Sequence, residues 1–133
     1  MKRRGYISMP NVELLEENNV SEELKGIFLK LKEKYGKVPA PMRALANHPE
    51  YFKIVLNKMD TVMGSDALEM KTKLALAYTI SVLNNCEFCI TMYAQQLRDA
   101  GFTDKQLIEI IAMIDAVGSM NHLNNGMLIK PGK

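Results

Sequence analysis

The sequence predicts an all-α protein. Apolar side chains recur every three to four residues along most of its 133 residues, as they do on the buried face of an amphipathic helix. Residues that favour helix starts and stops stand at the ends of these patterns. No run of alternating apolar and polar residues bounded by turn residues competes with them, so we expect no strand. A chain of this length builds one core, and we therefore expect a single domain.

The first half of the chain predicts three helical segments. Ser21 has the side chain of an N-cap, and Gly36 supplies a stop for the helix that follows it. Pro49 suits the first position of a later helix, which Gly64 ends. His48, just before Pro49, is expected to cap or orient that helix start. The expected bounds are 21–34, 42–47 and 49–64.

The second half predicts three more helical segments. The expected bounds are 69–83, 86–100 and 103 to at least 117. The first of them is apolar on nearly every side, which is typical of a central helix surrounded by others. Asn84 and Asn85 then interrupt the pattern. Thr103 and Gln106 have the spacing of a capping box, and Gly118 could bend the last helix before it resumes towards the C-terminus.

Composition and charge exclude several classes of protein. The net charge of +2 is the difference between 17 basic and 15 acidic residues, which argues against nucleic acid as a partner. Lys71 and Lys73 precede the most apolar stretch, so no run is long enough to span a membrane. No apolar run follows the basic start at residues 1–4, which argues against a signal peptide and predicts an ordered or frayed tail. We expect a soluble, cytoplasmic protein with no cofactor.

The chemistry of the sequence is concentrated in the segment Cys86-Glu87-Phe88-Cys89, at the start of a predicted helix. Cysteines three positions apart lie on nearly the same helix face, close enough for a disulfide if the turn geometry permits. The helix N-terminus favours thiolate over thiol and so raises reactivity. The chain has no other cysteine. We therefore favour a redox couple over the alternatives.

A zinc site and a pair of inert cysteines compete with a redox couple, whereas haem attachment and a thioredoxin fold can be set aside. A zinc site would need two more ligands from His48, His122 or carboxylates, and neither histidine has the usual spacing. Haem attachment is excluded because Ile90 stands where that motif requires histidine. A thioredoxin fold would place a strand before the motif, and none is predicted. Two buried, inert cysteines remain an open alternative.

Several stretches resemble the alkylhydroperoxidase and carboxymuconolactone decarboxylase superfamily. These are residues 37–50, residues 76–89 with their asparagine-rich approach to the CxxC pair, residues 100–103 and residues 120–125. The resemblance covers residues 20–128, with an N-terminal extension at 1–19 and a C-terminal tail at 129–133. It implies an AhpD-like helical bundle that assembles into trimers or hexamers. It also implies a small hydroperoxide substrate and an external thiol reductant.

The family's full motif is similar to Glu, eleven residues, Cys-x-x-Cys, three residues, His. Carried over by position, it makes Cys89 the attacking thiol and Cys86 the resolving one, whereas the helix-end argument favours attack by Cys86. The two predictions disagree. The glutamate and histidine positions hold Leu74 and Tyr93, so the family's proton relay is missing. Tyr93 could hydrogen-bond to a sulfur, and His122 is the best remaining proton carrier because histidines exchange protons near neutral pH.

The leading functional hypothesis is a thiol-disulfide oxidoreductase or peroxidase-like antioxidant protein. A carboxymuconolactone decarboxylase-type enzyme is the first alternative, although such members do not depend on a CxxC pair. A non-catalytic oligomeric binding protein is the second, and the missing relay is its best support.

Overall fold

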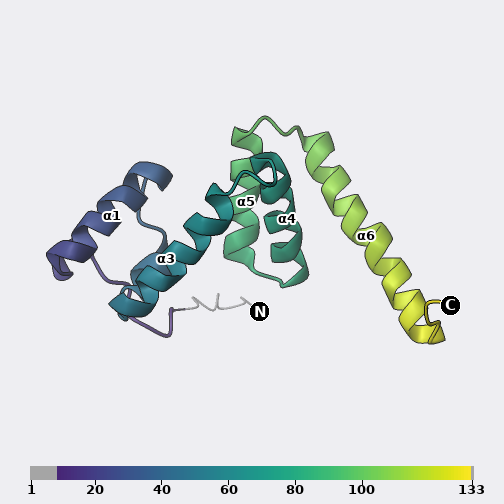
Figure 1. Cartoon of the computed structure of the whole chain (residues 1–133), viewed down its shortest axis with the longest axis horizontal. Coiled ribbons are helices and arrows are strands. Elements are labelled where there is room, and N and C mark those ends of the chain that lie inside the picture. The colour runs from purple at the N-terminus through teal and green to yellow at the C-terminus, as the bar shows by residue number, and fades with distance from the viewer. Residues whose placement is uncertain (1–8, 133) are drawn as a thin grey trace, which may run out of the picture. The chain divides into compact units, whose positions relative to one another are not determined.

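The computed structural model describes residues 9–132, so the basic start at residues 1–4 lies outside the described part (Figure 1). Its elements in chain order are the 3-10 turn η1 (Glu17–Asn19) and the helices α1 (Glu22–Tyr35), α2 (Ala40–Leu45), α3 (Pro49–Gly64), α4 (Met70–Leu83), α5 (Glu87–Asp99) and α6 (Asp104–Met127). No strand occurs within residues 9–132. The all-α prediction is confirmed. The chain divides into two compact units, the first ending at Gly64 and the second beginning at Ser65.

Helix ends in the first unit follow local signals in the sequence. The Ser21 hydroxyl accepts a hydrogen bond from the Leu24 amide at 3.3 Å, as expected of an N-cap. His48 caps α3, because its Nδ1 accepts from the Tyr51 amide at 3.2 Å. The prediction for α2 was wrong by two residues at each end, since this helix spans Ala40–Leu45 and not 42–47. Pro41 lies in its first turn, where a missing N–H costs nothing.

The core of the first unit is built around two phenylalanines. Phe28 of α1 and Phe52 of α3 are fully buried and meet edge to face, with ring centroids 6.4 Å apart. Leu24, Leu31 and Ala46 complete this buried cluster. The apolar stripes of α1 and α3 therefore hold the unit together.

The segment before α1 is fastened to α2 by polar contacts. The Arg43 guanidinium donates hydrogen bonds to the carbonyls of Leu14 and Leu15, and it pairs with the Glu16 carboxylate. The Asn47 amide donates to the Glu13 carbonyl at 2.7 Å. The described part of the N-terminal extension is thus an ordered part of the first unit.

In the second unit, α4 and α5 form an antiparallel helical hairpin. The covered face of α4 carries Lys73, Leu74, Tyr78 and Ser81, all buried. Helix α4 was expected to be surrounded by other helices, but among the described residues of the second unit only that face is buried. Leu76, Ile80 and Leu83 are exposed. The apolar surface of α4 is therefore larger than the part that this unit covers.

Helix α6 is a single uninterrupted helix of 24 residues, so Gly118 does not break it. It begins with the predicted capping box, in which Thr103 and Gln106 each bond the other's backbone amide. Leu107 is its one buried residue. No helix in the described part of the chain has the length and apolar composition needed to cross a bilayer.

Candidate active site

A tight turn between α4 and α5 positions the two cysteines. Asn85 adopts a left-handed conformation with a φ of 55°, which asparagine tolerates better than most residues. Around it, the Asn85 amide donates to the Val82 carbonyl at 3.1 Å, and the Cys86 amide donates to the Ser81 carbonyl at 3.0 Å. This pair of bonds is a Schellman motif. The Asn-Asn pair therefore ends α4 and fixes the backbone of Cys86.

Cys86 is the N-cap of α5, and Cys89 is the third residue of that helix. The Cys86 carbonyl accepts the first helical hydrogen bond, from Ile90 at 2.8 Å. Both cysteines are half-buried free thiols. The Cys86 side chain makes no capping hydrogen bond, as a serine at this position would. Nevertheless, an N-cap side chain faces the amide of the third helical residue, and this places the two cysteines beside one another.

The two thiols differ in acidity. Hydrogen bonding from the Cys89 thiol, and then from the Cys89 amide, lowers the pKa of Cys86 against an opposing effect of burial. Burial, followed by the interaction with Cys86, raises the pKa of Cys89 to about 11. When the pair loses a proton, Cys86 therefore becomes the thiolate and Cys89 stays a neutral thiol. Ionisation of Cys86 before Cys89 agrees with the helix-end argument. It opposes the assignment carried over from the family motif, in which Cys89 attacks.

The residues at the family's relay positions lie on two different helices, α4 and α5. Leu74 is buried on α4 and carries no exchangeable proton. Tyr93 is half-buried on α5, one turn beyond Cys89. Sequence reasoning missed two buried polar neighbours on the covered face of α4. The Lys73 ammonium donates to the Ser65 carbonyl, and the Ser81 hydroxyl donates to the Ala77 carbonyl. Their eight-residue spacing was the available signal, because it places both on one helix face.

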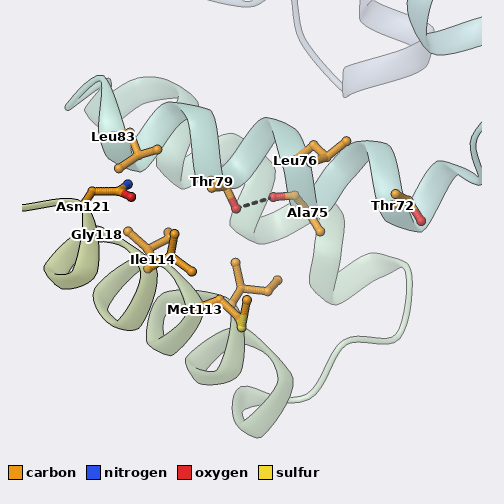
Figure 2. A pocket seen from close by; sticks show the side chains of 11 residues that line it. Thr72, Ala75, Leu76, Thr79, Leu83, Met113, Ile114, Gly118 and Asn121 are labelled. Atoms are coloured by element: carbon orange, nitrogen blue, oxygen red, sulfur yellow. Dashed lines mark hydrogen bonds between the residues drawn. The ribbon is translucent and has the colours of Figure 1, made fainter. Parts of the chain in front are cut away.

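His122 is exposed on α6. Among the described residues, none forms a hydrogen bond or an ion pair with its ring. Its neighbour Asn121, however, lies with Leu83 at one end of a groove between α4 and α6 (Figure 2). Leu83 is three residues before Cys86. The structure therefore brings the segment that carries His122 to the cysteine end of the second unit.

The groove between α4 and α6 has a volume of about 400 Å³. Its lining comes from both helices: Thr72, Ala75, Leu76, Thr79, Leu83, Ile110, Met113, Ile114, Val117, Gly118 and Asn121. The lining is mostly apolar, and the Thr79 hydroxyl donates to the Ala75 carbonyl at 2.8 Å (Figure 2). In the described part of the chain, no cluster of three or more His, Cys, Asp or Glu side chains could hold a metal ion.

Comparisons with known proteins identify the family. The sequence profile of the carboxymuconolactone decarboxylase family matches residues 49–129. The fold is similar to the crystal structure of the alkylhydroperoxidase AhpD core from Rhodospirillum rubrum, with a TM-score of 0.83 and 28% sequence identity. That match covers 94% of this chain and 96% of the other. A comparison with curated protein sequences finds no match.

The likeness confirms the predicted AhpD-like fold across residues of both units. The family profile takes in α3 to α6, including the turn that holds Cys86 and Cys89. The family profile and the structural similarity together support an alkylhydroperoxidase-like or related function, without specifying the activity. On this evidence, the chain belongs to the carboxymuconolactone decarboxylase family.

Proposed function

We propose that this protein is a thiol-disulfide oxidoreductase that reduces small hydroperoxides through Cys86 and Cys89. The observation that carries the proposal is the placement of two free thiols at the start of α5, with Cys86 at its N-cap and Cys89 at its third residue. The opposite shifts of their pKa values support it. A peroxide-reducing couple needs one thiolate to attack and one thiol to resolve. The similarity to an alkylhydroperoxidase AhpD core supports the same class of chemistry.

The proposed cycle has three balanced steps. The Cys86 thiolate attacks the terminal peroxide oxygen, the O–O bond breaks, and the departing alkoxide takes a proton to leave as an alcohol. Cys86 is then a sulfenic acid. The Cys89 thiol displaces its hydroxyl as water, which forms an intramolecular disulfide. An external dithiol reduces this disulfide by exchange and is itself oxidised to a disulfide.

The departing alkoxide needs a proton donor, and the family's glutamate and histidine are not there to supply one. We assign this role to His122, with Tyr93 as the other candidate. Tyr93 lies one turn from Cys89 on the same helix, but a tyrosine hydroxyl exchanges protons poorly at neutral pH. His122 lies on the segment of α6 that the groove brings to the cysteine end of the unit. We further propose that the protein works in the cytoplasm as a homo-oligomer.

Two other functions make different demands on the site. The decarboxylation for which the family is named does not require paired thiols, so the cysteine pair is better accounted for by disulfide chemistry. A non-catalytic binding protein would explain Leu74 and Tyr93, but it gives no reason for the difference in acidity between Cys86 and Cys89.

Hydroperoxide consumption with dithiothreitol as reductant tests the proposal. The wild type should turn over tert-butyl hydroperoxide, and Cys86→Ser and Cys89→Ser should each lose sustained turnover. Thr91→Ser, an exposed substitution on α5, is the matched control and should keep it. Equal turnover by all four proteins would exclude the proposed chemistry. If the disulfide cycles with dithiothreitol but no protein consumes peroxide, the protein is a dithiol oxidoreductase of another substrate class.

A further inference from the structure

One ring nitrogen of His48 faces two groups that make opposite demands on it. Its Nδ1 accepts a hydrogen bond from the Tyr51 amide at 3.2 Å, and the Glu50 carboxylate lies 3.5 Å from the same atom. An amide N–H needs an acceptor, so it bonds only to an unprotonated nitrogen. A carboxylate accepts hydrogen bonds, so it pairs only with a protonated nitrogen. The protonation state of His48 therefore decides which partner its Nδ1 has.

The bond to Tyr51 holds the first turn of α3. The first amides of a helix have no helical carbonyl to bond, and a capping side chain that accepts from the third residue replaces one of these missing partners. Tyr51 is the third residue of α3. The next amide, that of Phe52, donates to the main-chain carbonyl of His48 at 2.9 Å. The charge of the ring thus acts on the Tyr51 amide and does not remove the partner of the Phe52 amide.

Glu50 is the charged side chain that pairs with the His48 ring among the described residues. The side chains of His48 and Glu50 are 71% and 77% exposed, so the ring has room to turn from one partner to the other. The Tyr51 ring meets His48 edge to face, with centroids 6.2 Å apart, and adds no charge. The nearby charged groups on α3 and α2 have other partners, since Lys53 pairs with Glu23 of α1 and Arg43 pairs with Glu16.

We propose that His48 is a pH-dependent cap of α3, whose Nδ1 exchanges the Tyr51 amide for the Glu50 carboxylate when the ring takes a proton from solvent. The neutral ring accepts from the amide and holds the first turn. The protonated ring donates to the carboxylate and leaves the amide to water. Its positive charge also opposes the partial positive charge of the helix N-terminus. Histidines change charge between about pH 5 and 8, so the cap is present at the upper end of this range and lost at the lower end.

The effect of this exchange belongs to the first unit. The turn that His48 caps leads directly into Phe52, which is fully buried against Phe28. Mild acid therefore loosens the backbone next to the centre of this core. The exchange does not depend on the thiol chemistry proposed for the second unit.

Amide hydrogen exchange of the full chain, followed by NMR at pH 8 and pH 5 and corrected for the intrinsic effect of pH, tests the cap. The Tyr51 amide should lose about fivefold in protection at pH 5, because an N-cap bond is worth about 1 kcal/mol. The Phe52 amide is the internal reference and should keep its protection. In His48→Ala the Tyr51 amide should be poorly protected at both pH values. In His48→Asn it should be protected at both, because an asparagine oxygen caps without titrating.

The carboxyl carbon of Glu50 reports the other half of the exchange. Its ¹³C chemical shift should change in step with the His48 ring signals between pH 8 and pH 5, and this step should be absent in His48→Asn. The proposal is overturned if Tyr51 protection in the wild type is the same at both pH values, or if Phe52 loses as much protection as Tyr51. It is also overturned if His48→Asn shows the wild-type loss at Tyr51, or if Glu50 does not respond to His48. Far-UV circular dichroism checks that both variants stay helical.

Discussion

Reduced protein treated with limiting iodoacetamide at pH 7.5 should be alkylated mainly on Cys86. The reaction consumes thiolate, and the two thiols of the pair differ in how readily they ionise. Hydrogen bonds from Cys89 lower the pKa of Cys86, whereas burial raises the pKa of Cys89 to about 11. The lower pKa keeps the Cys86 thiolate present at lower pH. The preference for alkylation of Cys86 should therefore be greatest near neutrality and should vanish as the pH approaches the pKa of Cys89.

The size of the preference follows from two opposing effects. With the ordinary cysteine pKa of 9.0 as the upper limit for Cys86, its thiolate fraction at pH 7.5 exceeds that of Cys89 by about 100-fold. A less basic thiolate is also a weaker nucleophile, which for this difference costs about 8-fold. The net preference for Cys86 is therefore at least about 12-fold, and the lowered pKa of Cys86 increases it.

Peptide mass spectrometry at low conversion measures this ratio directly. Replacing Cys89 with alanine removes the largest cause of the Cys86 shift, so the pKa of Cys86 should rise towards its ordinary value and its alkylation at pH 7.5 should slow. Replacing Cys86 with alanine should leave the Cys89 pKa raised, because burial is the largest cause there. Equal alkylation of the two cysteines in the wild type, or faster alkylation of Cys89, would refute the conclusion that Cys86 ionises first.

Three further predictions concern the relay, the core and the turn. Combining Leu74→Glu with Tyr93→His should raise the initial rate of hydroperoxide consumption about 10²-fold, and no gain in a folded double mutant points to His122 as proton carrier. Phe52→Ala should lower the free energy of unfolding in urea by about 3–5 kcal/mol, against under about 0.5 kcal/mol for the exposed control Leu29→Ala; similar losses would contradict the core assignment. Asn85→Val should cost about 1–2 kcal/mol in the same assay and Asn85→Gly should not, whereas equal effects would show that the left-handed turn is unimportant.

Helix ends were predictable because their causes are local. Each cap acts on a backbone amide within three residues, as seen at Ser21, at His48 and in the Thr103 capping box. The local sequence is therefore enough to predict where these helices begin. The expected start of α2 at residue 42 was wrong because a proline such as Pro41 suits either a loop or a first helical turn. The exposed face of α4 was not foreseen. The apolar pattern shows that a surface will be covered but not whether the same chain covers it.

The sequence predicted where the two cysteines lie but not which of them ionises first. The CxxC pattern placed Cys86 and Cys89 at a helix start, and the structure has them there. Which thiol ionises first depends on how deeply Cys89 is buried, and burial depends on the packing of the folded chain and not on the spacing of two cysteines. For the same reason, the sequence identified His122 as a candidate proton carrier but not its position relative to the cysteines.

Trapping the first intermediate tests the assigned chemistry most directly. Cys89→Ser and Cys86→Ser proteins, each reduced and given one equivalent of tert-butyl hydroperoxide with dimedone present, cannot close the intramolecular disulfide. A sulfenic acid on the remaining cysteine is therefore captured as a dimedone adduct. We predict rapid adduct formation on Cys86 in the Cys89→Ser protein and little on Cys89 in the Cys86→Ser protein. The reverse pattern would show that Cys89 attacks the peroxide, and no adduct in either protein would contradict hydroperoxide reduction by this pair.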